Sequence, residues 1–263
     1  MSIIGKVDSL WRYPVKSLAG EALREAFVGF AGIYGDRIFA FKSAAKSKRF
    51  PYLTARDHGA IIGWRAQFRH PEQAAQPPNW AEASTGPTGL TPLYAKPAEM
   101  GVDVMLPSGA TFAIDDPALL DQLRTEPDDT AELTLLYSER ALTDCRPVSL
   151  FSLQTVAQLG AEIGEPLDAR RFRANIYADL PAMLGFAEDG LVGRSLRIGE
   201  KTVLTIMGRD GRCVMITLDP DSGKSNPQVL RTVAQSHEGM AGIYCVVLVE
   251  GMIKPGDAIE LLD

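Results

Sequence analysis

Basic side chains gather in four short segments that also carry hydroxyl, amide and thiol groups. Residues 12–17 and 35–37 lie in the first half of the chain, and residues 170–175 and 209–213 lie in the second. Guanidinium and ammonium groups hold phosphate-like anions through short, charge-assisted hydrogen bonds. The segments therefore predict an anion site built across both halves, with scattered surface arginines in structural ion pairs as the alternative.

The three cysteines lie far apart, and each has a different expected role. Their odd number and the lack of a Cys-x-x-Cys pair argue against a disulfide framework, a structural zinc site and an iron–sulfur cluster. Cys213 follows Arg212, whose charge favours ionisation of the thiol, but it also precedes an apolar run in which it would be a small buried side chain. Cys245 is expected in the core, and Cys145 is expected in a loop.

Other catalytic motifs fail on spacing. The Gly-Lys-Ser sequence at residues 223–225 resembles the end of a phosphate-binding loop, but Leu218 stands where that motif requires glycine, so we interpret it as a turn. His58, His70 and His237 are never at metal-ligand spacing, and no Gly-x-Ser-x-Gly sequence occurs. A dispersed Ser-His-Asp set stays open, because geometry and not spacing defines it.

Charge and hydropathy exclude whole classes of protein. The 263 residues include 27 Lys plus Arg and 33 Asp plus Glu, a net charge of -6, whereas a general nucleic-acid binder needs a basic excess. With 46% hydrophobic and 23% charged residues, the composition is that of a soluble globular protein of one large or two modest domains. No apolar run suits a membrane span or a signal peptide, so we expect a cytoplasmic protein with no membrane partner.

Strand patterns dominate the elements that must position these groups. In the first half, a strand is predicted from residue 3 that Pro14 closes. Further strands are predicted twice within 21–41, at 59–68, and as a hairpin at 102–114, followed by a helix from 116. The basic stretch at 42–50 is expected as a solvated hairpin tip, with a binding patch as the alternative, and 70–97 as a long loop or lid.

The second half adds helices near 153–163 and 226–236 among further strands, which include 212–219. No alternation of strand and helix of the kind that builds a parallel sheet is visible. The expected fold is therefore β-rich α+β, with a mostly antiparallel barrel and helices packed outside it. We predict an N-terminal unit at residues 1–125 and a second unit at 126–263.

Several segments resemble one known family, in the same order along the chain. YPVKSLAGE at 13–21, GIYGDRIFAF at 32–41 and LTAR at 53–56 resemble the N-terminal β-barrel domain of MOSC proteins. RRFRANI at 170–176 and GRCVMITLDPDSG at 211–223, with the C-terminal IKPGDAIELL, resemble the MOSC domain itself, named from the C-terminal domain of molybdenum cofactor sulfurase. The resemblance implies an antiparallel MOSC barrel with flanking helices and a smaller N-terminal β-barrel.

The resemblance also implies a cofactor and its contacts. It predicts that the molybdenum cofactor (Mo-molybdopterin), a pterin with a dithiolene-bound metal and a terminal phosphate, is held between the two units. In the family's two-unit members, which include the mitochondrial amidoxime-reducing component, a cysteine binds the metal, and Cys213 matches it as metal ligand and catalytic residue. The matching cofactor-binding residues are Lys16, Ser17, Arg37, Arg173, Asn175, Arg212 and Tyr244.

The chemistry of these residues agrees with that assignment. Lys16, Ser17, Arg37 and Arg173 suit a phosphate, the side chains of Asn175 and Tyr244 suit the polar edge of a pterin, and a thiolate donates readily to high-valent molybdenum. For two of them a structural role is the alternative: Lys16 as a solvated strand residue, and Asn175 as a side chain that bonds backbone at a strand end. Residues 144–146 lie at another contacting turn of the family, but they differ from its pattern and receive no role.

Three functions follow as hypotheses. The first is an oxidoreductase that removes oxygen from small N-hydroxylated or N-oxide compounds, with electrons from a separate protein because the chain has no clustered cysteines of a ferredoxin domain. The second is a molybdenum cofactor carrier or a sulfur-transfer protein in which Cys213 holds the cofactor or a persulfide. The third is a protein that keeps the fold without the cofactor and binds another anion.

Overall fold

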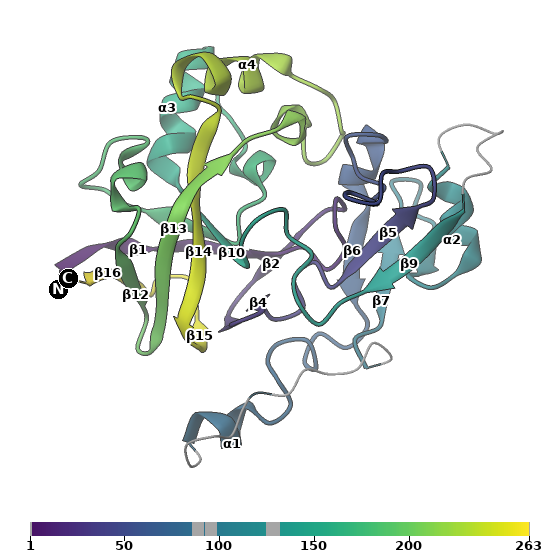
Figure 1. Cartoon of the computed structure of the whole chain (residues 1–263), viewed down its shortest axis with the longest axis horizontal. Coiled ribbons are helices and arrows are strands. Elements are labelled where there is room, and N and C mark those ends of the chain that lie inside the picture. The colour runs from purple at the N-terminus through teal and green to yellow at the C-terminus, as the bar shows by residue number, and fades with distance from the viewer. Residues whose placement is uncertain (1, 86–91, 93–98, 125–131, 263) are drawn as a thin grey trace.

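The computed structural model describes residues 2–85, 92, 99–124 and 132–262. A β-barrel forms one side of the molecule, with helices α3 and α4 above it, and smaller sheets form the other side (Figure 1). The β-rich α+β fold expected from the sequence is confirmed.

Seven strands close the barrel within the described residues. Around it run β1 (Ser2–Arg12), β11 (Ile176–Asp179), β10 (Val148–Ser152), β14 (Met240–Val249), β13 (Thr202–Gly211), β12 (Ser195–Ile198) and β16 (Ala258–Leu262), which returns to β1. Alternate side chains of these strands, such as Leu204, Ile206 and Ile243, are fully buried inside it. The period-2 pattern of the sequence therefore places one face of each strand in the barrel core.

One pair of barrel strands is parallel, although the sequence shows no visible alternation of strand and helix. β10 pairs with β11 in parallel, and α3 (Leu153–Ile163) makes the crossover between them. A parallel pair needs such a crossover, since a tight turn can join only antiparallel strands. All other strand pairs of the barrel are antiparallel.

Two helices cover the outside of the barrel at the end near the site. α3 begins at Ser152, whose hydroxyl accepts from the backbone N–H of Thr155, and α4 (Pro227–Ser236) begins at Asn226, whose side chain accepts from Gln228. Both N-terminal caps satisfy donors that a helix start leaves free. Their apolar faces pack on a cluster that contains Phe151.

The remaining strands form three small sheets, of which two border a second core and one packs on both cores. They are β3 (Ala26–Gly29) and β4 (Gly32–Ile33) with β15 (Gly251–Ile253), then β5 (Phe39–Ser43) with β9 (Leu133–Tyr137), and β6 (Arg65–Phe68), β7 (Val102–Met105) and β8 (Thr111–Ala113). β2 (Glu21–Leu23) pairs with the end of β1. The short helices are α1 (Trp80–Thr85) and α2 (Pro117–Gln122).

Three predictions of local structure are wrong. Residues 21–41 contain parts of four strands and not two, and 3-10 helices occupy Gly59–Gly63 and Val214–Thr217, where strands were expected. In the second of these segments Val214 is exposed and Met215 is half-buried, and the next three residues, Ile216 to Leu218, are all buried. The segment therefore lacks the alternation of buried and exposed residues that a strand shows. Within the expected loop at 70–97, α1 forms a short helix.

The two predicted units share strands. β1 belongs to the barrel although it comes from the first unit, and β15 of the second unit pairs with β3 of the first. The predicted boundary near residue 125 lies outside the described residues, as does most of the segment 86–97, and the division at 125 stays a prediction. Among the described residues, no helix is long and apolar enough to cross a membrane.

Candidate functional site

A polar cleft opens where the barrel meets the small sheets. Its empty space, counted together with the open solvent at its mouth, is about 760 Å³. Its described lining has seven basic side chains and only two carboxylates, so positive charge predominates. The charged residues are Lys16, Arg37, Arg56, Arg146, Arg171, Arg173 and Arg212, with Asp144 and Asp210.

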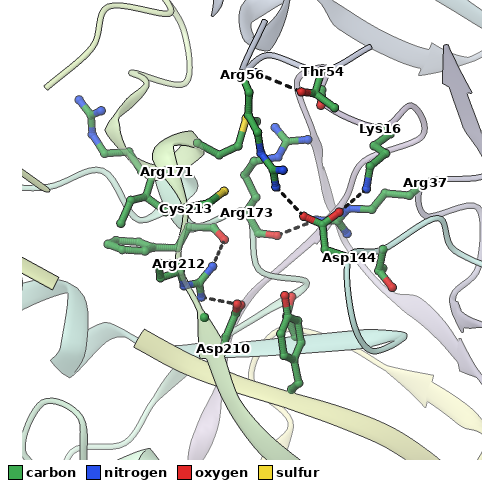
Figure 2. A pocket seen from close by; sticks show the side chains of 18 of the residues that line it. Lys16, Arg37, Thr54, Arg56, Asp144, Arg171, Arg173, Asp210, Arg212 and Cys213 are labelled. Carbon is green, nitrogen blue, oxygen red and sulfur yellow. Dashed lines mark hydrogen bonds and ion pairs between the residues drawn. The ribbon is translucent and has the colours of Figure 1, made fainter. Parts of the chain in front are cut away.

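Cys213 supplies a thiol to this cleft. It follows the end of β13 at Gly211 and precedes the 3-10 helix at Val214–Thr217. Its side chain is partly exposed, and Figure 2 shows the sulfur pointing into the space between the arginines. Cys213 is therefore accessible to a bound molecule, which the buried-hydrophobe alternative does not allow. Cys245 is buried and Cys145 is exposed, in line with the core and loop positions expected for them.

Three residues of the cleft adopt left-handed backbone conformations. Ser17 has φ 71°, Arg37 has φ 48° and Arg173 has φ 53°, and only two other described residues apart from glycine, Phe186 and Glu238, have positive φ. Such conformations cost about 1–3 kcal/mol each and persist where surrounding contacts enforce them, often at functional sites. Here they turn basic or hydroxyl side chains from separate segments toward one cavity.

Backbone carbonyls fix the arginines across the two halves. Arg37 donates to Asp36 at 2.6 Å and to the carbonyl of Arg173 at 2.8 Å, and Arg173 donates to the carbonyl of Leu18 at 2.7 Å. The ring of Tyr13 faces both guanidinium groups, at 4.5 Å from Arg37 and 4.3 Å from Arg173. Because each half holds the cations of the other, their positions are set before any ligand arrives.

Asp144 joins two cations from the opposite wall. Its carboxylate lies 2.5 Å from the Lys16 ammonium and 2.9 Å from the Arg56 guanidinium, as the dashed lines in Figure 2 show. Burial favours the neutral acid, but Lys16 and Arg56 outweigh it, so the pKa of Asp144 lies below its ordinary 3.8. Asp144 is therefore charged at neutral pH and is an internal anion of the cleft.

Two cations of the cleft, the buried Lys16 and the half-buried Arg173, lose hydration that no anion of the protein fully replaces. Desolvation lowers the pKa of Arg173 to about 10, and it also lowers the pKa of Lys16 despite the attraction of Asp144. Burial lowers the pKa of Arg37 too, but Asp36 outweighs it and raises the value overall. A further anion near Lys16 and Arg173 would stabilise their charged forms, and this is the electrostatic signature of an anion site.

Arg212 and Asp210 form a buried ion pair beside Cys213. The two groups lie 2.8 Å apart, and the Arg212 guanidinium also donates to the carbonyls of Ala241 and Phe172 at 2.7 and 2.9 Å. Burial raises the pKa of Asp210, and burial together with Asp210 raises that of Tyr244. Several N–H groups of Arg212 are thus already bonded within the protein, so we interpret Arg212 as a residue that stabilises the cleft wall.

Asn175 is the one predicted site residue that does not line the cleft. It is 1% exposed, its side-chain oxygen accepts from the backbone N–H of Ser149 at 3.2 Å, and its amide donates to the carbonyl of Trp11 at 3.3 Å. These bonds tie β10 to β1 and correspond to the structural alternative. The other predicted residues, Lys16, Ser17, Arg37, Arg173, Arg212, Cys213 and Tyr244, all line it.

Sequence reasoning missed part of the wall. Arg56 lies in the LTAR segment and Arg171 in the RRFRAN segment, both of which were noticed but gave no role to these residues. Asp144 and Arg146 depart from the family pattern, and Asp210 lies between two arginines, so the sequence predicts no role for these three residues. A search for charged residues within every resembling segment would have found the first two.

The donor set limits what a metal could bind here. Among the described residues, no group of three or more His, Cys, Asp and Glu side chains could hold a metal ion. A metal in the cleft would take a soft thiolate from Cys213 and its other ligands from a bound molecule. A metal–organic group with an anionic tail fits both the thiol and the cations.

Comparison with known proteins agrees with this layout. The MOSC N-terminal beta barrel domain matches residues 4–70 and the MOSC domain matches residues 138–260. Over 53% of this chain and 17% of the relative, the sequence is 33% identical to molybdenum cofactor sulfurase of Drosophila grimshawi. It is 30% identical to mitochondrial amidoxime-reducing component 1 of Xenopus laevis over 45% of this chain and 37% of that protein.

The chain thus spans less than half the length of these curated relatives. The solved structure of the YUAD protein from Bacillus subtilis covers 98% of this chain and 94% of its own, at 13% identity and a TM-score of 0.47. The two matches include every described residue that lines the cleft and nearly all of the barrel strands, whereas β7, β8 and β9 of the small sheets lie between the two matches. The chain therefore belongs to the family of proteins in which a MOSC N-terminal β-barrel domain precedes a MOSC domain.

Proposed function

We propose that this protein is an oxidoreductase that binds the molybdenum cofactor in the cleft and reduces N-hydroxylated or N-oxide compounds with electrons from a separate protein. The observation that carries the proposal is an accessible thiol, Cys213, in a cleft whose cations come from both halves of the chain. Relatives named for molybdenum cofactor sulfuration and amidoxime reduction support the choice of cofactor and substrate. We also predict a cytoplasmic location.

The residues present fit the cofactor by their chemistry. Lys16, Ser17, Arg37 and Arg173 would hold its phosphate, because their donors converge and two of them are buried without full compensation. Cys213 would bind the metal, and Tyr244 would face the pterin. The bound group would supply the exchange of two electrons and one oxygen atom with the substrate.

The chain's own residues position and protect this chemistry. The Arg212–Asp210 pair and the carbonyls of Ala241 and Phe172 fix the backbone that presents Cys213. Asp144 holds Lys16 and Arg56 at one wall until an anion competes for them. The hydrogen bonds of Asn175 tie β1 to β10.

Substitution of Cys213 tests the catalytic assignment. We expect Cys213→Ala to keep the far-ultraviolet circular dichroism of the wild type and to lose turnover of benzamidoxime by about 100-fold or more, since even groups that only orient a metal ligand change activity 10–100-fold. Dithionite-reduced methyl viologen serves as electron source, and Cys245→Ala is the matched control. Full activity in Cys213→Ala would show that the assignment is wrong.

The second candidate function is a cofactor carrier or a sulfur-transfer protein. The 33% identity to molybdenum cofactor sulfurase favours it, and Cys213 would then hold a persulfide or the cofactor in transit. Purified protein that contains molybdenum, reduces no N-oxygenated compound with any electron donor and transfers its cofactor to an apoenzyme would establish this function instead.

A further inference from the structure

A basic loop follows β5 and carries charge that the cleft does not use. Between Lys42 and Arg56 the chain has five basic residues and no carboxylate, within a protein of net charge -6. The backbone bridge between Lys42 and Tyr52 closes residues 43–51 into a loop. Residues 42–49, which we call the basic loop, are therefore positively charged, whereas the protein as a whole is negatively charged.

Most of these cations are free for a partner. Lys42, Lys48 and Arg49 are exposed and form no ion pair within the described part of the chain, whereas Lys46 pairs with Asp57 at 2.5 Å. Like charges held close together repel each other, and a partner of opposite charge relieves that repulsion.

Two aromatic rings attach the loop to the cleft wall. Phe50 and Tyr52 pack edge to face with centroids 5.2 Å apart. The Lys16 ammonium lies 5.2 Å from the Tyr52 ring, and the Arg56 guanidinium lies 5.2 Å from the Phe50 ring. Since Lys16 and Arg56 line the cleft (Figure 2), a partner seated on the loop would lie at its mouth.

One residue of the cleft lining and one residue beside it add an exposed basic and an exposed apolar side chain. Arg146 is exposed and forms no ion pair among the described residues. Val214, between the cleft residues Cys213 and Met215, is 44% exposed although it is a large apolar residue. An apolar spot with charged residues around it is the usual composition of a protein interface.

We propose that the basic loop, together with Arg56, Arg146 and Val214, is the docking surface for an acidic electron-transfer protein. The inference rests on the proposed function, because reduction of an N-hydroxylated compound consumes two electrons and two protons, breaks the N–O bond and releases water. A donor must supply those electrons at the cleft mouth, and a basic surface steers an acidic donor there. The protein's net negative charge disfavours long polyanions such as nucleic acids.

The test reverses the loop's charge and compares two electron sources. Lys48→Glu/Arg49→Glu is the variant, and Arg231→Glu/Lys254→Glu, which changes two exposed basic residues on α4 and after β15, is the matched control. With reduced flavodoxin as an acidic donor at about 0.01 M salt, we expect the donor's kcat/KM to fall about tenfold or more in the variant only. The wild-type value should fall toward the variant's at about 0.15 M salt, where charges are screened.

Controls separate this inference from the proposed function. Turnover with methyl viologen, which needs no docking surface, should be equal in all three proteins, and its absence in the wild type would refute the proposed function alone. Even in that case, docking can be measured by titrating flavodoxin with each protein and determining the affinity from NMR chemical shifts. Equal affinity of the wild type and Lys48→Glu/Arg49→Glu for flavodoxin would overturn the proposed docking surface. So would wild-type binding to anionic vesicles or to an RNA oligonucleotide that is tighter than its binding to flavodoxin.

Discussion

At the scale of single residues, the cleft contains cations that are costly to bury without a bound anion and residues with strained backbone conformations. Lys16 and Arg173 are cations whose pKa values burial lowers, and Ser17, Arg37 and Arg173 keep strained backbones. The cost of each group has to be met by contacts elsewhere in the fold. Binding of an anion offsets the desolvation of Lys16 and Arg173, which links the burial of these two cations to the proposed cofactor.

The three thiols should differ sharply in reactivity. With Ellman's reagent at about pH 8, we expect Cys145 to react first, Cys213 more slowly, and Cys245 only after unfolding, because Cys245 is buried and its burial raises its pKa to about 12. Cys145→Ser and Cys213→Ser should each remove one of the two reactive thiols from the native protein. A third thiol that reacts without denaturant would contradict the burial of Cys245.

Asp144 should make stability depend on pH in acid. Its pKa is lowered in the folded protein, so it stabilises the fold above its ordinary value of 3.8 and loses that contribution as the pH falls through the lowered value. Asp144→Asn should therefore lower the free energy of unfolding at neutral pH by about 1 kcal/mol or less, because Asp144 is partly exposed to screening solvent.

Urea unfolding of wild type and Asp144→Asn at about pH 7 and about pH 3 measures this difference, which should shrink in acid. Asp8→Asn, which removes an exposed carboxylate that forms no ion pair with any described residue, is the charge-matched control and should stay close to the wild type at neutral pH. A difference between wild type and Asp144→Asn that grows as the pH falls would reverse the sign expected here.

At the scale of elements, strands and turns bring the site residues together. Gly242 in β14 has φ +78°, and a Cβ there would lie 2.5 Å from the Phe151 ring and 3.0 Å from the Arg212 guanidinium. Arg212 packs over the rings of Phe151 and Phe172. The glycine therefore makes room for the stack that supports the segment before Cys213.

Gly242→Ala should lower stability more than Gly239→Ala. Both glycines have positive φ, and alanine is strained there by about 1–3 kcal/mol, but a Cβ at Gly239 would meet nothing within 4 Å. The clash with Phe151 adds to the cost only at Gly242. Free energies of unfolding from urea titrations compare the two, and equal losses would show that Phe151 does not constrain this turn.

The elements also show how far sequence patterns reach. Helices α3 and α4 and the hairpin of β7 and β8 could be predicted because caps, turn residues and periodicity act locally. The parallel pair of β10 and β11 could not, since pairing between strands depends on the whole sheet. The same holds for Asn175, whose hydrogen bonds to Ser149 and Trp11 join residues distant in sequence.

At the scale of the whole molecule, the two halves are interlocked around the cleft. β1 closes the barrel of the second half, and β15 returns to the sheet of the first. The basic clusters that the sequence separates by more than 100 residues meet because of this exchange, and the cleft is positive in a protein of net charge -6. A positive cleft in an acidic protein focuses its attraction on small anions and on acidic partners.

The most direct test of the account is the content of the purified protein after expression in a host that makes the molybdenum cofactor. We predict about one molybdenum and one pterin per chain, by mass spectrometry of the metal and fluorescence of the oxidised pterin, with both lost in Arg37→Ala/Arg173→Ala and the metal site altered in Cys213→Ala. The control double variant Arg231→Ala/Lys254→Ala, which changes two exposed residues, should retain both the molybdenum and the pterin. Wild-type protein free of molybdenum and pterin would contradict the account and leave the cleft as a site for another anion.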